Sequence, residues 1–134
     1  MRTQSVLRVV VTKRGKVKPS EFRIREGEIG LSLFRADESV SPDAILDAVR
    51  AAGKQGELVL VDIPAATIRR LGLVLVSTPG GTPDPEVNRL HVEARFSWWK
   101  RMWLRLRRKP IHSAFNDTVA TVLAAEATPY GGGS

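Results

Sequence analysis

The chain has 134 residues, 43% of them hydrophobic and 26% charged, with no cysteine and a net charge of +7. This length and composition predict a single globular domain over residues 1–130 and exclude a disordered chain, a disulfide-stapled fold and a thiolate metal site. No apolar run approaches the roughly 20 residues of a membrane-spanning helix, and the N-terminal stretch lacks a signal-peptide pattern, so we expect a cytoplasmic protein.

Three strands are predicted in the first 35 residues. Residues 5–12 (SVLRVVVT) are rich in β-branched side chains, and residues 13–20 (KRGKVKPS) have the composition of a turn or hairpin tip. In residues 21–25, Phe22 and Ile24 alternate with charged residues, which is the period of a half-buried strand. Residues 29–35 place their apolar side chains on one face in the same way.

Residues 41–53 carry clear start and stop signals for a helix. Ser41 is a good N-cap, Pro42 suits the first helical position, and Asp43 suits the positive end of the helix dipole. Apolar residues then recur at i, i+3, i+4 and i+7, and Gly53 can close the helix in the left-handed conformation.

The next segment predicts a β-α-β unit. Residues 58–61 (LVLV) form a continuous apolar run typical of a strand covered on both faces, and residues 73–77 (LVLVS) predict a second buried strand. Between them, residues 64–71 predict a short helix stopped by Gly72. This helix is short for a parallel crossover, so the strand direction stays open. Residues 77–86 (STPGGTPDPE) read as a loop.

Residues 90–98 give the cleanest alternation in the chain and predict a strand with one wet side. From Trp99 the period becomes helical, which predicts a helix over residues 99–109 ended by Pro110, and a last helix is expected over residues 113–127. The predicted fold is therefore an α/β (α+β mixed) domain: a single mixed sheet of about five or six strands, with the β-α-β unit and two C-terminal helices. Residues 131–134 (GGGS) read as a flexible tail or linker.

The positive charge is concentrated in one segment. Residues 95–109 contain seven basic residues and no acidic residue, and the remaining 14 basic residues equal the 14 acidic residues of the whole chain. A charge so localised is a footprint for a polyanion, an acidic protein or an anionic membrane surface.

The helix over residues 99–109 has two interpretations. Its apolar stripe could dock on the sheet and leave the cations merely solvated; this stripe contains Trp99, Met102, Trp103 and Leu106, with Leu104 on the other side. The functional interpretation, which we prefer as a hypothesis, is a small non-enzymatic binding module that docks an anionic partner, nucleic acid first. The residues predicted to bind the polyanion are Arg95, Lys100, Arg101, Arg105, Arg107, Arg108 and Lys109, with Trp98 as the stacking residue.

Three other partners stay open for this helix. They are an acidic protein surface, an anionic membrane interface, and a larger complex of which this chain is a subunit. The apolar stripe decides among them: burial in the core would exclude membrane insertion, whereas an interaction subunit requires the stripe to be exposed.

An enzymatic alternative rests on His91, Glu93 and Arg95, which share the wet side of the strand. A base, a carboxylate and a cation at this spacing could serve a nucleotide-handling transferase or hydrolase, provided that they converge in a pocket with the loop at residues 77–81. The Ser77-Thr78 step with a carboxylate further on resembles ADP-ribosyl-transfer sites, at a spacing that is not diagnostic. The bland interpretation is an exposed strand with an ordinary ion pair. No metal and no cofactor are predicted, because His91 and His112 are the only histidines and no ligand cluster surrounds them.

Overall fold

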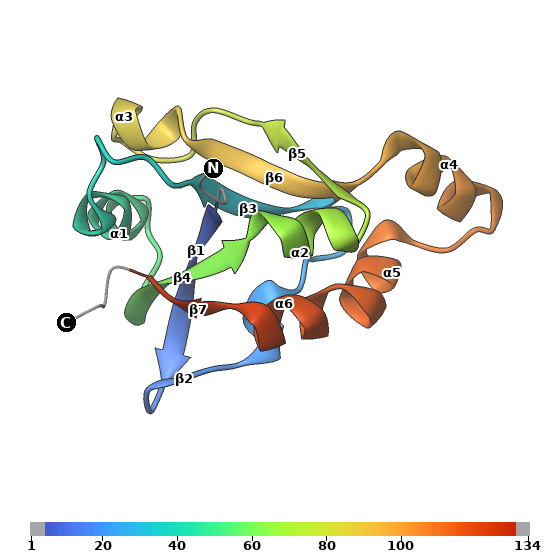
Figure 1. The fold of residues 1–134 in the computed structure, drawn as a ribbon, viewed down its shortest axis with the longest axis horizontal. Coiled ribbons are helices and arrows are strands. Elements are labelled where there is room, and N and C mark those ends of the chain that lie inside the picture. Colours follow the sequence, from blue (N-terminus) through green and yellow to red (C-terminus); the bar gives the residue numbers. More distant parts are fainter. Residues whose placement is uncertain (1–4, 131–134) are drawn as a thin grey trace.

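The computed structural model describes residues 5–130 as one antiparallel sheet with helices packed on both faces (Figure 1). The strands are β1 (Ser5–Lys13), β2 (Lys16–Val17), β3 (Gly30–Arg35), β4 (Glu57–Pro64), β5 (Leu73–Ser77), β6 (His91–Phe96) and β7 (Thr128–Pro129). They follow the order β5-β6-β3-β1-β4-β7, and β2 pairs with β1. The prediction of an α/β domain built on one sheet is confirmed. The sheet was expected to be mixed, but every strand pair within residues 5–130 is antiparallel.

Seven short helices surround the sheet within residues 5–130. They are the 3₁₀ helix η1 (Pro19–Phe22), α1 (Pro42–Ala51), α2 (Ala65–Arg70), α3 (Pro85–Asn88), α4 (Trp98–Leu106), α5 (Ile111–Thr118) and α6 (Ala120–Glu126). Two hydrophobic clusters occupy the two faces of the sheet. The larger one includes buried residues of η1, α2, α4, α5 and α6, and the smaller one includes residues of α1 and α3. Strand β4 contributes to both clusters, which confirms a strand covered on both faces.

The predicted start and stop signals of α1 are confirmed. The Ser41 hydroxyl accepts a hydrogen bond from the backbone N–H of Ala44 at 3.1 Å, Pro42 is the first helical residue, and Gly53 has φ of 110°. The helix buries Ile45 and Ala48 in the smaller cluster. Local signals and packing agree here, because the cap fixes where the helix begins and the sheet covers its apolar face.

The strand, helix and strand of the predicted β-α-β unit all form, but the two strands are not neighbours in the sheet. Strand β4, helix α2 and strand β5 follow one another, but β6, β3 and β1 lie between β5 and β4 in the sheet. Strand β5 is therefore an edge strand, not the buried strand predicted, and its Val74 side chain is 44% exposed. A continuous apolar run does not distinguish a central strand from an edge strand.

Three further local predictions differ from the structure. The strand predicted at residues 21–25 is wrong: η1 and an extended segment stand there, because the side-chain amide of Asn116 bonds both the N–H and the carbonyl of Ile24 in place of a partner strand. The single last helix is divided into α5 and α6 at Val119, where φ is −107°. The loop after β5 also contains α3, whose N-cap Asp84 accepts hydrogen bonds from two backbone N–H groups.

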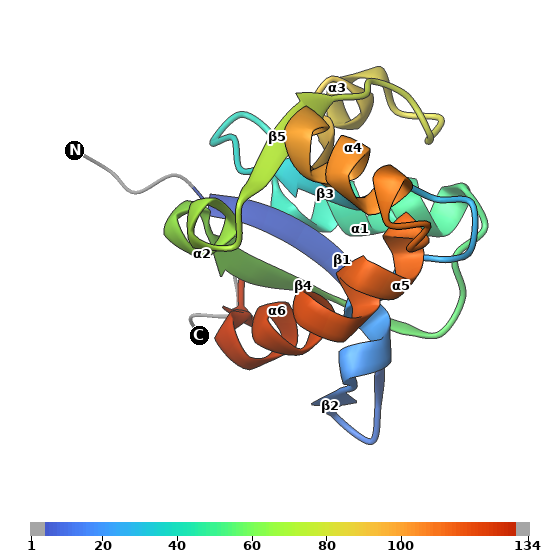
Figure 2. The ribbon, with the colours of Figure 1, turned by 90° about the vertical axis from the view of Figure 1, so that its right-hand side faces the viewer.

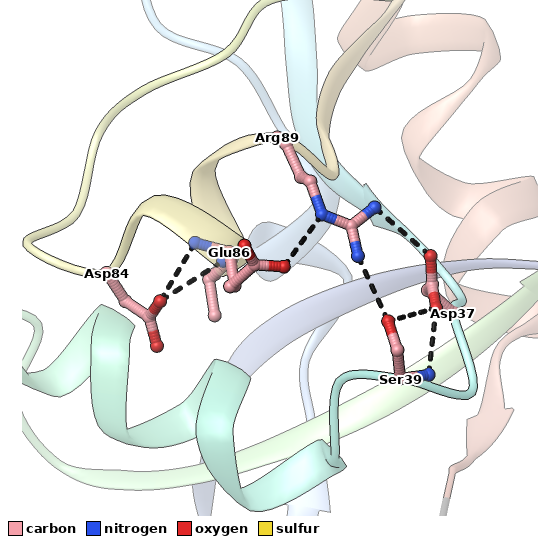
Figure 3. Close-up of polar contacts among 6 residues, drawn as sticks. Asp37, Ser39, Asp84, Glu86 and Arg89 are labelled. Carbon is pink, nitrogen blue, oxygen red and sulfur yellow. Dashed lines mark hydrogen bonds and ion pairs between the residues drawn. The ribbon is translucent and has the colours of Figure 1, made fainter.

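A polar cluster joins the loop before α1 to the end of α3 (Figure 3). The Arg89 guanidinium lies 3.2 Å from the Asp37 carboxylate and 3.0 Å from the Glu86 carboxylate, and it donates to the Ser39 hydroxyl. The hydroxyl and the backbone N–H of Ser39, and then Arg89, hold the pKa of the Asp37 carboxyl below its ordinary value. The cluster thus fastens α3 to the loop that leads into α1.

The sheet is split between β1 and β3. These strands pair only at Val6–Arg35 and Leu7–Phe34, whereas β1 and β4 pair along eight residues. Beyond the split, side chains take the place of the missing strand partner. Lys54 donates to the carbonyl of Val9, Glu21 accepts from the N–H of Val11, and Arg8 donates to the carbonyl of Ser32. Charged groups are therefore placed inside the sheet, where strand pairing would otherwise exclude them.

Candidate functional site

Helix α4 continues directly from the sheet. Strand β6 ends at Phe96 and α4 begins at Trp98, so Ser97 alone separates them, and its hydroxyl accepts a hydrogen bond from the N–H of Lys100 at 3.3 Å. Helices α4 and α5 lie at the same end of the molecule (Figure 2). One side chain of α4 is fully buried: Leu104 is 1% exposed and belongs to the larger core cluster. This single apolar anchor decides which side of α4 faces the domain.

The apolar stripe predicted for α4 points into solvent. Of the four residues of the stripe, Trp99 is 77% exposed, Trp103 45% and Leu106 81%, whereas Met102 is half-buried. Trp98, outside the predicted stripe, is also exposed, at 55%. At about 100° per residue, Leu104 lies roughly opposite Trp99 and Leu106 on the helix. The interpretation that the stripe docks on the sheet is therefore wrong, because Leu104, which stood outside the stripe, is the residue that docks. Exposed large apolar side chains grouped on one surface are typical of an interaction site.

The cations of the segment border this apolar surface and are largely unpaired. Among ion pairs formed within residues 5–130, the six basic residues from Lys100 to Lys109 contribute one, in which Lys109 lies 3.7 Å from the Asp117 carboxylate. Lys100 and Arg107 each lie 4.6 Å from the centroid of the Trp103 ring. Arg108 ends the helix with φ of 55°, a left-handed conformation that glycine normally adopts at this position. The domain's own carboxylates therefore leave the positive potential of α4 almost intact.

A groove of about 440 Å³ runs between α4 and the start of α5. It is lined by Trp98, Arg101, Met102, Arg105, Lys109, Pro110 and Ile111, with no acidic residue. The Nε atom of Arg101 is buried and has no hydrogen-bond partner within residues 5–130. The basic side chains that line this groove, Arg101, Arg105 and Lys109, can donate hydrogen bonds to an anionic oxygen.

The remaining residue predicted to bind a polyanion lies apart from α4. Arg95 is on β6, half-buried, and both its Nε and Nη2 atoms lie 2.9 Å from the Glu93 carboxylate. Trp98, the predicted stacking residue, contacts Trp99 edge to face with ring centroids 4.8 Å apart. The surface that the structure assembles therefore consists of α4 and the residues that follow it; we call it the α4 surface and define it by residues 98–109.

The cavity that His91 lines does not contain the other two residues of the enzymatic alternative. His91 lines a cavity of about 170 Å³ together with Gly80, Gly81 and Thr82, but Glu93 and Arg95 do not line it. The Nδ1 atom of His91 lies 2.7 Å from the carbonyl oxygen of Thr78, and since a carbonyl only accepts, the ring donates through Nδ1. Glu93 is bound to Arg95. The geometry thus favours the ordinary ion pair over an acid-base group.

Sequence reasoning missed a charged cleft at the split between β1 and β3. A cavity of about 470 Å³ opens there, and its charged lining residues are Arg8, Arg23, Arg25, Lys54, Glu21 and Glu28. Burial lowers the pKa of Arg8 to about 10, against the opposing effect of the Glu21 and Glu28 carboxylates. Burial, and then the charge of Arg8, lower the pKa of Lys54. The one sequence signal was an arginine within the β-branched run of residues 5–12, where an apolar residue would be expected at a core position.

Comparison of the chain with protein-family models, with curated proteins and with solved structures finds no match. No helix within residues 5–130 is long and apolar enough to cross a bilayer. In the same part of the chain, no three histidine, aspartate or glutamate side chains gather as a metal site would require. The function must therefore be argued from the α4 surface and the cleft themselves.

Proposed function

We propose that this chain is a non-enzymatic docking module that binds an anionic membrane surface through α4. The observation that carries the proposal is the exposure of the apolar stripe: Trp99 and Leu106 are the most exposed large hydrophobic side chains of residues 5–130, and cations lie beside them. A helix with Trp and Leu on one face and Lys and Arg around it is suited to lie in the plane of a lipid interface. A cytoplasmic location, expected from the sequence, is compatible with this, since the cytoplasmic leaflet carries a negative surface potential.

The contacts of the tryptophans favour lipid over nucleic acid, the partner placed first by the sequence. Base stacking requires a free ring face, but Lys100 and Arg107 already lie over the ring of Trp103. The edge-to-face contact between Trp98 and Trp99 occupies one further ring face. Leu106 has no ring to stack. In a lipid interface, by contrast, all of these apolar groups leave water at once, and lysine and arginine stems reach toward the headgroups.

Two energetic terms support peripheral binding. Each basic residue near an anionic bilayer contributes about 1 kcal/mol, and burying a large apolar side chain contributes about 1.5–3 kcal/mol. The groove beside α4 adds a basic lining, because Arg101, Arg105 and Lys109 border it and can donate to a headgroup phosphate. Helix α4 spans nine residues, so it lies on the membrane and does not cross it.

Vesicle binding tests the proposal directly. All three tryptophans of the chain lie in α4, so tryptophan fluorescence reports on this surface alone. We expect co-sedimentation and a blue shift with vesicles of phosphatidylcholine mixed with phosphatidylglycerol, and much weaker binding to phosphatidylcholine alone. The double variant Trp99→Ala, Leu106→Ala should lower the partition coefficient by about tenfold or more. The control is Val74→Ala, which shortens an exposed apolar side chain on β5, outside α4.

Three results would overturn the lipid assignment. The first is binding to a single-stranded oligonucleotide, steeply weakened by salt, without binding to vesicles; this would restore nucleic acid as the partner. The second is a concentration-dependent dimer in which the tryptophans become inaccessible to a soluble quencher, which would make the α4 surface an interface between copies. The third is equal binding to anionic and neutral vesicles, which would remove the role of the cations.

A further inference from the structure

The split between β1 and β3 is a second site, distinct from the α4 surface. It is lined by β1, by β3, by the segment from η1 to Glu28 and by Lys54, which follows α1, and none of the residues of α4 lines it. The cavities of about 470 Å³ and 170 Å³ share Arg8, Ser32 and Lys54 as lining residues. The larger volume falls within the range of small-molecule sites, about 300–1,000 Å³.

Arg8 is the central group of this cleft. Its Nε atom donates to the carbonyl of Glu21 at 2.7 Å and its Nη1 atom to the carbonyl of Ser32 at 2.7 Å, so the guanidinium is fixed in position. Within residues 5–130, Nη2 makes no hydrogen bond and Arg8 has no carboxylate within ion-pair distance. Burial lowers the pKa of Arg8 to about 10, although the nearby Glu21 and Glu28 carboxylates act in the opposite direction without pairing directly with the guanidinium.

Lys54 brings a second cation to the same place. Its ammonium group donates to the carbonyl of Val9 at 3.1 Å, and the charge of Arg8 helps to lower its pKa. Two partly buried cations held near each other repel. If the pair served only to fill space in the fold, an apolar side chain could do so without this repulsion. An anion between them would relieve the repulsion and supply the missing acceptor.

The charge of the cleft specifies a dianion. Four basic residues line it, and its two carboxylates each accept a hydrogen bond from the backbone, Glu21 from Val11 and Glu28 from Arg25. The excess of two positive charges matches a phosphate monoester, which carries about −1.5 to −2 charge at neutral pH. The smaller cavity adds an apolar wall of Phe34 and Val49 and a loop of two glycines, where the non-phosphate part of a ligand can lie.

We propose that the split between β1 and β3 binds a small phosphorylated ligand, with its phosphate held by Arg8 and Lys54 and with Arg23 and Arg25 at the rim. A nucleoside monophosphate has the size and charge that the cleft requires. We expect no reaction at the phosphate, because the groups that could act as acid or base are already engaged: His91 donates to Thr78, and Glu21 and Glu28 each accept from a backbone N–H. It is therefore a binding site, and the ligand is a bound effector or cargo.

Calorimetry with inorganic phosphate and with adenosine monophosphate tests this site on the intact chain. We expect both probes to bind and the nucleotide to bind more tightly. Lys54→Gln should weaken binding about tenfold or more, since a charged hydrogen bond is lost. The urea unfolding midpoint of the ligand-free variant should change little, because loss of the repulsion with Arg8 offsets the lost contact to Val9. If Lys54 were purely structural, the variant would instead unfold at a lower midpoint and bind phosphate as the parent chain does.

The controls separate this site from the α4 surface. Arg23→Gln should weaken phosphate binding, whereas Arg69→Gln, on the exposed side of α2 and away from the cleft, should leave it unchanged. The vesicle-binding variant Trp99→Ala, Leu106→Ala should bind both probes like the parent chain, and Lys54→Gln should bind vesicles like the parent chain. Absence of binding by both probes, or binding that is insensitive to Lys54→Gln and Arg23→Gln, would overturn the proposal.

Discussion

Helices α1 and α4 have the same kind of apolar periodicity, but the apolar face of α1 is buried and that of α4 is exposed. Helix α1 turns Ile45 and Ala48 into the core, and α3 and its polar cluster hold the neighbouring loop in place (Figures 1 and 3). Helix α4, at the opposite end of the long axis, buries Leu104 and turns its apolar stripe outward. The difference teaches that a stripe of apolar residues identifies a face that must be covered, without saying whether the domain itself covers it.

The largest effect should come from removing the two anchors. Ile45→Ala in α1 and Leu104→Ala in α4 should each lower the free energy of unfolding by about 2–5 kcal/mol, because both side chains are 1% exposed. Trp99→Ala should change it by about 0.5 kcal/mol or less, since exposed substitutions are nearly neutral. Urea unfolding measures all three. A loss of stability at Trp99 as large as that at Leu104 would mean that α4 is turned the other way.

A smaller effect is expected where α4 ends. Arg108 has φ of 55°, so Arg108→Gly should raise the free energy of unfolding by about 1 kcal/mol by relieving the left-handed strain. The same change should weaken vesicle binding, because one cation leaves the α4 surface. Arg14→Gly is the matched control: Arg14 also has φ of 55°, but it lies in the turn between β1 and β2. Equal effects of both variants on vesicle binding would show that α4 has no special role.

The smallest effect concerns the cluster beside α1. Since the pKa of the Asp37 carboxyl is lowered in the folded chain, the charged form contributes stability above the ordinary aspartate pKa, and that contribution is lost as pH falls through the lowered value. Asp37→Asn should therefore be slightly less stable than the parent chain at neutral pH and equally stable in strong acid. Urea midpoints measured across the acidic range check this. A gap that stays constant down to strong acid would assign the loss to something other than the carboxylate charge.

The sequence predicted most elements whose signals are local. The cap at Ser41 and the glycine stop at Gly72 are confirmed, because each depends on neighbours within a few residues. The strand alternation predicted over residues 90–98 is confirmed as far as Phe96, and Trp98 already belongs to α4. What failed depends on distant partners. The segment around Ile24 reads as a strand until Asn116, far along the chain, occupies its backbone, and the order of strands places β4 and β5 apart.

The sites divide in the same way. The basic segment was found from the sequence because its charge is contiguous, but its orientation depends on Leu104 packing into a core built by other segments. The cleft was missed, because Arg8 and Lys54 are separated along the chain and meet only where β1 leaves β3. A solitary arginine within an apolar strand pattern was its only trace, and one such residue does not indicate what it faces.

The single residue between β6 and α4 has a mechanical consequence. Because only Ser97 stands between strand and helix, and Leu104 is fixed in the core, no flexible linker separates the exposed indoles from the sheet. A bilayer that captures α4 would therefore set the tilt and the height of the entire domain. The cleft at β1 and β3 would then open at one constant angle to the membrane, and its ligand would always arrive from the same direction.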